Sequence, residues 1–143
     1  MTDELRLSGA IADEMIAHSL DDRPNEACGI LAASDGVVSK VFRMANEKAS
    51  PMRYKMSDRE MMAVQDEIDD TGLQMVAGYH SHTRTEAYPS PTDVKEAALG
   101  DLLYVIVSLM NEKPLIRAFR IIKKNMGDDT GEIEEIPVVV EGR

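Results

Sequence analysis

The chain has one cysteine, no long apolar run and few basic residues, and each shortage excludes a class of protein. A single thiol, Cys28, cannot form an internal disulfide, which favours a reducing compartment. No stretch approaches the ~18 to 20 apolar residues of a membrane-spanning helix. The first residues, Met1 to Glu4, are acidic and precede no apolar run, so no secretory signal peptide is expected. We therefore expect a cytoplasmic protein.

Positive charge is also scarce, since 16 lysines and arginines face 26 aspartates and glutamates, for a net charge of -10. Nucleic acids and anionic membranes both select a basic surface, so neither is an expected partner. Glycine-rich phosphate-binding motifs of the Rossmann and P-loop types are absent from the sequence. The 143 residues are 43% hydrophobic and 29% charged, as in soluble globular proteins, and we expect a single domain spanning residues 1–143.

Apolar periodicity and turn residues predict a mixed α/β (α+β-like) fold built around one sheet. About six or seven strands and three helices are expected. The helices are expected at 8–21, 57–70 and 91–99, and the strands at 5–7, 27–33, 37–44, 73–81, 102–109, 115–122 and 133–140, with a short strand near 52–54. The second helix is expected to begin with a capping box formed by Ser57 and Glu60.

The most informative stretch is His80-Ser81-His82, which is followed by Ser90 and Asp93. On a strand, residues i and i+2 point to the same face, so both imidazole rings can face one ion while Ser81 points away. Two imidazoles and a carboxylate are the ligand set of a catalytic zinc site, in which the fourth position stays open. The spacing therefore predicts a zinc site at His80, His82 and Asp93.

Two of these residues, and the general base that such a site needs, also have simpler interpretations. Ser90-Pro91-Thr92-Asp93 has the form of a helix start, with Ser as N-cap, Pro at the first helical position and an acid at the third. Glu26, at the mouth of the strand expected at 27–33, is the candidate base. An acid in that position is more often a solvated edge residue.

Together these segments resemble the JAMM family of zinc metallopeptidases, also called MPN+. The family pattern is a Glu on an early strand, then His-x-His, seven residues, Ser, two residues and Asp, and Glu26, His80, His82, Ser90 and Asp93 match every position. The resemblance implies a curved, mostly antiparallel β-sheet flanked by helices, the cytidine-deaminase-like fold. It also implies that His80, His82 and Asp93 bind zinc, that Glu26 is the general acid/base, and that Ser90 stabilises the oxyanion.

A narrower resemblance, to bacterial CysO-cysteine peptidases of the Mec type, is carried by Asn25 to Gly29 and by Tyr79 to Lys95. Members of that branch hydrolyse the amide between the C-terminal glycine of a small ubiquitin-like sulfur-carrier protein and cysteine. The resemblance therefore implies a carrier with a Gly-Gly tail as the partner. Other JAMM enzymes remove ubiquitin-like proteins from lysines, so an isopeptidase is the alternative. The short chain, and Thr83 where many members have Pro, favour the small bacterial branch over a polyubiquitin substrate.

Three interpretations from other classes have less support. Non-catalytic scaffolds that bind ubiquitin-like proteins usually lack some metal ligands, whereas this chain has the full set. A zinc deaminase needs Pro-Cys-x-x-Cys, which one cysteine cannot supply. A cysteine protease would pair Cys28 with a histidine, but Cys28 is expected to be buried and the clustered histidines to bind metal. His18 is expected to be a surface or half-buried helix residue. The sequence leaves a homodimer open.

Two surfaces near the motif have both a structural and a functional interpretation. Six methionines, at 44, 52, 56, 61, 62 and 75, either fill the core or form an adaptable apolar surface for the partner. Thr85, Glu86 and Tyr88 either form a simple loop or line the path of the carrier tail, which is expected to bind in an extended conformation.

Overall fold

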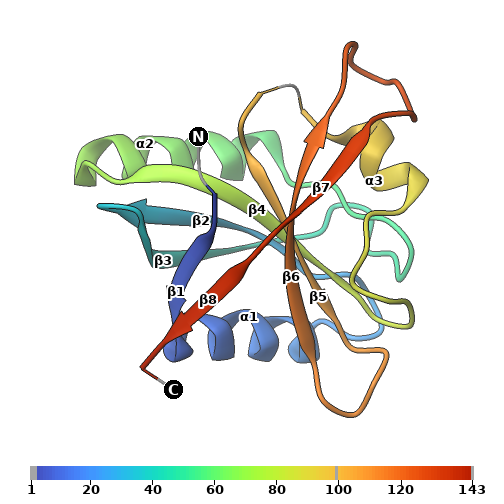
Figure 1. Cartoon of the computed structure of the whole chain (residues 1–143), viewed down its shortest axis with the longest axis horizontal. Helices are drawn as coiled ribbons and strands as arrows, with labels where there is room; N and C mark the ends of the chain where they lie inside the picture. The colour runs from blue at the N-terminus through green and yellow to red at the C-terminus, as the bar shows by residue number, and fades with distance from the viewer. Residues whose placement is uncertain (1–2, 99, 143) are drawn as a thin grey trace.

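The computed structural model describes residues 3–98 and 100–142, which form a mixed sheet flanked by helices (Figure 1). The helices are α1 (Gly9–Asp21), α2 (Asp58–Thr71) and α3 (Pro91–Glu96). The strands are β1 (Leu5–Ser8), β2 (Cys28–Ser34), β3 (Val37–Met44), β4 (Gln74–His82), β5 (Leu103–Ser108), β6 (Leu115–Ile122), β7 (Glu132–Ile136) and β8 (Val138–Glu141). The eight strands lie in the order β7-β6-β5-β4-β2-β3-β1-β8.

The sheet is curved and mostly antiparallel, as expected from the resemblance. Among its seven neighbouring pairs, β1–β3, β1–β8 and β4–β5 are parallel and the other four are antiparallel. β7 and β8 are separated only by Pro137, yet they pair with opposite ends of the sheet. The sheet therefore curls until its two edges come close to one continuous segment, which crosses the molecule diagonally in Figure 1.

The single strand expected at 133–140 is wrong, because Pro137 divides it into β7 and β8. Proline has no N–H to donate to a ladder, so it ends the pairing of β7 with β6. Its carbonyl instead accepts a hydrogen bond from Leu5 N at 2.8 Å, which starts the pairing of β8 with β1.

Both faces of the sheet are covered, and β2 contributes alternate side chains to each. Leu31 packs in a core with Ala12 and Met15 of α1, whereas Ile30 packs in a second core with Val64 of α2. In Figure 1, α1 lies on one side of the sheet and α2 and α3 lie on the other. Because β4 alternates in the same way, Tyr79 joins the α1 core while the flanking positions face α2 and α3.

Helix ends agree with the sequence signals at some positions and differ at others. The Ser57 side chain caps α2 by accepting from Glu60 N at 3.3 Å, but the Glu60 carboxylate accepts from Ala45 N at 3.1 Å. The second half of the expected capping box is therefore wrong. Helix α3 ends at Glu96 rather than at Leu99, and Leu99 lies outside the described residues.

The segment between β3 and α2 is a loop without the short strand expected near 52–54. An isolated antiparallel bridge between Asn46 and Met56 closes this loop. None of the described helices combines the length and the apolar character needed to cross a membrane.

Candidate metal centre

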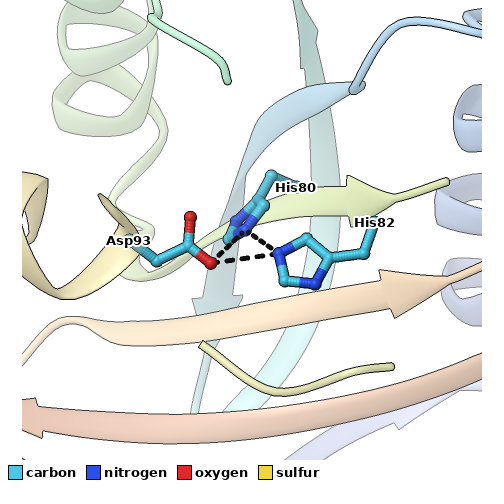
Figure 2. Close-up of side chains that lie close together, drawn as sticks. All are labelled: His80, His82 and Asp93. Atoms are coloured by element: carbon cyan, nitrogen blue, oxygen red, sulfur yellow. Dashed lines mark hydrogen bonds and ion pairs between the residues drawn. The ribbon is translucent and has the colours of Figure 1, made fainter. Parts of the chain in front are cut away.

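Three donor atoms converge where the C-terminal end of β4 meets the first turn of α3 (Figure 2). The Oδ2 atom of Asp93 lies 3.2 Å from His80 Nε2 and 3.0 Å from His82 Nε2. The two Nε2 atoms are 3.1 Å apart, and His80 is only 1% exposed. Within the described part of the chain, these residues are the one group of His, Cys, Asp and Glu side chains that could hold a metal ion.

The chemistry of the donors fits a bound metal ion. In a tetrahedral site with metal–ligand bonds of ~2.0 to 2.1 Å, neighbouring ligand atoms lie about 3.3 to 3.4 Å apart. The observed separations of 3.0 to 3.2 Å between these donor atoms are close to that value. His82 Nδ1 lies 2.9 Å from the Glu86 carbonyl and donates its proton to it, so Nε2 is the ring atom that can bind a metal ion.

The electrostatics also suit ligation. Burial alone would raise the pKa of the Asp93 carboxyl, but the hydrogen bonds with His80 and His82 outweigh burial and hold it well below its usual range. Asp93 is therefore ionised at neutral pH, as a carboxylate ligand must be.

The helix start expected at Ser90 to Asp93 is confirmed, and the cap and the donor cluster share atoms. Ser90 Oγ accepts from Asp93 N at 3.1 Å, and Asp93 Oδ2 accepts from Ser90 N at 2.9 Å, which completes a capping box. The same Oδ2 atom faces both imidazoles. The cap therefore fixes the rotamer that brings the carboxylate into the cluster.

Helix α3 is also held from its other end. Lys123 Nζ, just beyond β6, donates to the carbonyls of Val94 and Lys95 at 2.8 and 2.9 Å. These carbonyls belong to the last turn of α3, where a cation is favourable. Since α3 has only six residues, this anchor restrains the element that carries Asp93.

The simpler interpretation of Glu26 as a solvated edge residue is wrong, because only 5% of this residue is exposed. The register between β2 and β4 pairs Cys28 with His80, and Ser81 N donates to Ala27 O at 3.0 Å. Continuing that register by one residue brings Glu26 next to His82. Burial raises the pKa of the Glu26 carboxyl to about 7, with a smaller rise from Asp93 and an opposing effect of His82.

The Glu26 carboxyl has the properties of a proton carrier. Its Oε1 atom is buried and has no hydrogen-bond partner among the described residues. Glu26, His82 and Ser90 line one cleft of about 100 Å³ together with Pro51, Met52, Thr83, Arg84 and Thr85. The structure therefore brings all five residues of the sequence pattern to one place.

Ser81 points away from the imidazoles, as expected, and has a role that the sequence analysis missed. Its Oγ atom accepts from Ala27 N at 2.8 Å in a fully buried position. Together with the bond from Ser81 N to Ala27 O, this contact fixes the residue that follows Glu26. Strand pairing decides which residue lies opposite Ser81, and no local signal reveals it.

Comparison with known proteins assigns the chain to a family. Residues 8–122 match the model of the prokaryotic homologs of the JAB domain. The chain belongs to this family. The resemblance to JAMM/MPN+ proteins found in the sequence is thereby confirmed.

This JAB-domain chain is similar to proteins along nearly its whole length. A CysO-cysteine peptidase of Mycobacterium tuberculosis is 38% identical over 133 residues, which cover 91% of this chain and 86% of the relative. A desampylase of Pyrococcus furiosus is 30% identical over 116 residues, 81% of this chain and 76% of the relative. The solution structure of a Desulfitobacterium hafniense protein superposes with a TM-score of 0.84 at 30% identity and covers 97% of this chain and 94% of that one.

Further residues of this JAB-domain chain surround the cluster. The Tyr54 ring stacks on the His80 ring, with centroids 4.5 Å apart and an interplanar angle of 23°. No sequence signal reveals this contact, because Tyr54 lies in an irregular loop with no periodicity. In the loop after β4, Thr85 O accepts from Ser108 Oγ at 2.6 Å and Tyr88 packs edge-on against Phe119. This loop is therefore anchored beside the cleft, with Thr85 on the cleft wall.

Two residues considered in the sequence analysis lie outside the cluster. His18 is fully buried rather than exposed or half-buried, and its Nδ1 lies 2.6 Å from the Tyr79 hydroxyl while Nε2 lies 3.2 Å from Asp22. Cys28 is fully buried, as expected, and burial raises the pKa of its thiol to about 12. A thiol in that state is a poor nucleophile at neutral pH.

The methionines divide between the two interpretations. Met44, Met56, Met61 and Met75 pack in the core beneath α2, whereas Met52 and Met62 are 73% and 69% exposed. Met52 is the exposed one that also lines the cleft. Core filling therefore explains four of the six.

Proposed function

We propose that the chain is a zinc-dependent peptidase that cleaves the amide after the C-terminal glycine of a ubiquitin-like sulfur-carrier protein and releases cysteine. The observation that carries this proposal is the convergence of His80, His82 and Asp93 beside the buried, unpartnered carboxyl of Glu26. The similarity to a CysO-cysteine peptidase over 91% of the chain supports the substrate class. Residues 1–143 are proposed to form one domain.

In this proposal His80 Nε2, His82 Nε2 and Asp93 Oδ2 hold the zinc ion. When bound, zinc supplies a Lewis acid for the glycyl carbonyl and lowers the pKa of a water molecule to around 7. Glu26 accepts a proton from water and transfers it to the leaving amine of cysteine. A carboxyl whose pKa is raised to about 7 can do both near neutral pH.

Ser90 is proposed to donate its O–H to the oxyanion that develops on the glycyl carbonyl. Its Oγ already accepts from Asp93 N, which fixes the side chain at the cleft wall and leaves the hydroxyl proton for the substrate. The Glu86 carbonyl holds the His82 tautomer throughout, because it accepts from Nδ1.

The first test is mass spectrometry of a ubiquitin-like carrier extended by one C-terminal cysteine and incubated with the zinc-loaded protein. The wild type is expected to remove one cysteine mass. Glu26→Gln is expected to keep zinc and fold but to lose nearly all turnover. Glu112→Gln, which changes an exposed glutamate in the β5–β6 turn, is the matched control and should match the wild type. Full turnover by Glu26→Gln would exclude Glu26 as the base.

An isopeptidase that removes ubiquitin-like proteins from lysines is the second candidate, and the similarity to a desampylase favours it. Incubation with a carrier attached to a lysine side chain distinguishes the two activities. Cleavage of that conjugate alone would replace the first proposal. Cleavage of neither substrate by a protein shown to hold one zinc ion would favour a non-catalytic scaffold for ubiquitin-like proteins.

The remaining parts of the proposal concern partners and location. The partner is a carrier protein with a Gly-Gly tail, and neither nucleic acid nor a membrane takes part, in keeping with the net charge of -10. A cytoplasmic location rests on the single, buried cysteine. A homodimer stays a hypothesis, for which sedimentation velocity is the direct measurement.

A further inference from the structure

The Asn46 side chain uses all of its hydrogen-bonding capacity on backbone groups. Its Nδ2 atom donates to Glu26 O and to Arg53 O, both at 3.0 Å. Its Oδ1 atom accepts from Lys48 N at 3.0 Å and from Lys55 N at 3.1 Å. An amide has two donor hydrogens and two acceptor positions, so each has a partner. One side chain thus joins three separate segments of backbone.

The first of these segments contains Glu26, whose backbone is held on both sides by the loop that Asn46 organises. Glu26 O accepts from Asn46 Nδ2, and Glu26 N donates to Ser50 O at 2.9 Å. Ser50 is brought into place by the turn in which Lys48 N and Ala49 N bond to the side chain and carbonyl of Asn46. Glu26 precedes β2, so its main chain has no partner strand of its own and depends on this loop.

The other two bonded groups, Arg53 O and Lys55 N, flank Tyr54. The Tyr54 ring stacks on His80, one of the three residues of the candidate metal site. Asn46 therefore restrains two residues through their backbone. These residues are Glu26, and Tyr54, whose ring packs against His80. No other described side chain bonds to the Glu26 main chain and to the Tyr54 loop.

We propose that Asn46 is a positioning residue that holds Glu26 in position beside the candidate metal site of His80, His82 and Asp93. This inference rests on the proposed function, because it assumes that Glu26 carries the proton. Asn46 itself is not a catalytic residue, since all its polar atoms are used on backbone groups. Its contribution is to hold the Glu26 carboxyl at the cleft, because the Glu26 main chain itself bonds to the loop and not to a strand.

Two variants separate its donor and acceptor roles. Asn46→Ala removes all four hydrogen bonds. Asn46→Asp keeps two acceptor bonds, from Lys48 N and Lys55 N, but loses both donors and places a carboxylate oxygen against two carbonyls. The matched control is Ser57→Ala, which removes the cap of α2 just after the loop and destabilises that helix without touching Glu26.

Residue-level amide exchange by NMR tests the geometry without zinc or substrate. In Asn46→Ala the Glu26 amide is expected to exchange at least about tenfold faster, because the loop that supplies Ser50 O is released. The same increase is expected in Asn46→Asp, because a carboxylate oxygen then faces the Glu26 carbonyl and pushes the Glu26 backbone away. The Ala27 amide, bonded to Ser81 Oγ, is expected to keep its protection. The Lys55 amide should lose protection in Asn46→Ala but keep it in Asn46→Asp. An unchanged Glu26 amide in both variants would overturn the inference.

Steady-state kinetics with the carrier–cysteine substrate tests the consequence. Both Asn46 variants are expected to lower kcat by about tenfold or more at little-changed KM and zinc affinity, because a displaced carboxyl affects the chemical step. Ser57→Ala should keep kcat within about twofold. Equal kcat values in Asn46→Ala and Ser57→Ala would overturn the inference while leaving the proposed function intact. If the wild type itself releases no cysteine, the proposed function fails and the exchange data alone decide the inference.

Discussion

Removing the hydroxyl of Ser81 should cost stability without removing a metal-cluster residue. Ser81 lies between His80 and His82 but faces the opposite side of β4, where its Oγ accepts from Ala27 N at 2.8 Å. Ser81 and Ala27 are both fully buried. In Ser81→Ala the Ala27 N–H therefore has neither a protein acceptor nor access to bulk water.

The expected loss follows from that orphaned donor. A buried polar group left without its partner costs about 1 to 3 kcal/mol, so we expect about 2 kcal/mol from the free energy of unfolding. For a chain of this length, 1 kcal/mol corresponds to roughly 3 to 4 °C, so Tm should fall by about 7 °C. The m value should stay unchanged, because the surface exposed on unfolding is nearly the same.

Urea unfolding of the metal-free protein, followed by circular dichroism, measures this change directly. Ser39→Ala is the matched control, because Ser39 is an exposed serine on strand β3 of the same sheet and should change stability by less than about 0.5 kcal/mol. If Ser81→Ala and Ser39→Ala unfold at the same urea concentration, the hydroxyl does not satisfy the Ala27 amide and the reasoning fails.

Three further outcomes are expected. Lys123→Met should weaken zinc binding by about three- to tenfold in chelator competition, because α3 loses the cation that bonds its last carbonyls, whereas the exposed neighbour Lys124→Met should bind zinc as the wild type does. Gly29→Ala should cost about 3 kcal/mol or more in urea unfolding, since its Cβ would lie 2.3 Å from Tyr79 and 2.5 Å from Phe42 O; Gly78→Ala, whose Cβ meets nothing closer than 3.9 Å, should be nearly neutral. The last outcome concerns pH, in excess chelator. Folding raises the pKa of Glu26 from 4.5 to about 7, so protonation of this carboxyl stabilises the folded state. That stabilisation is complete below pH 4.5 and is lost as the pH rises through 7. The Tm of the wild type should therefore fall relative to Glu26→Gln across that interval, and parallel Tm curves would contradict the burial of an unpartnered carboxyl.

The sequence predicted most of the fold because its signals were local. Apolar runs bounded by turn residues placed β2, β3 and β6 within a residue or so, and Ser8 and Ser57 marked the starts of α1 and α2. The errors occur where a distant element competes for a local group. The Glu60 carboxylate bonds Ala45 N rather than the Ser57 backbone, and Pro137 sends β8 to the opposite edge of the sheet.

The sequence predicted those parts of the candidate site that belong to a recognisable motif. His80, His82 and Asp93 share a short segment, so their convergence follows from strand and helix geometry. The burial of Glu26 was not predictable, because the register between β2 and β4 decides it. The proposed role of Asn46 was not predictable either, because Asn46 belongs to no motif. Its four backbone partners are known only from the folded structure.

The shared use of Asp93 Oδ2 links the start of α3 to the order of the donor cluster. Two imidazoles beside a carboxylate would ordinarily rotate apart to reach water, since each side chain loses rotamer entropy when it is held. Here the Ser90 amide holds the carboxylate by the same capping box that starts α3, and the Glu86 carbonyl holds the His82 ring. The cost of ordering two donors is therefore offset by hydrogen bonds that the helix and the loop make in any case. If the proposed zinc ion binds here, side chains restrained by these hydrogen bonds lose less freedom on binding it, which favours a tightly held ion.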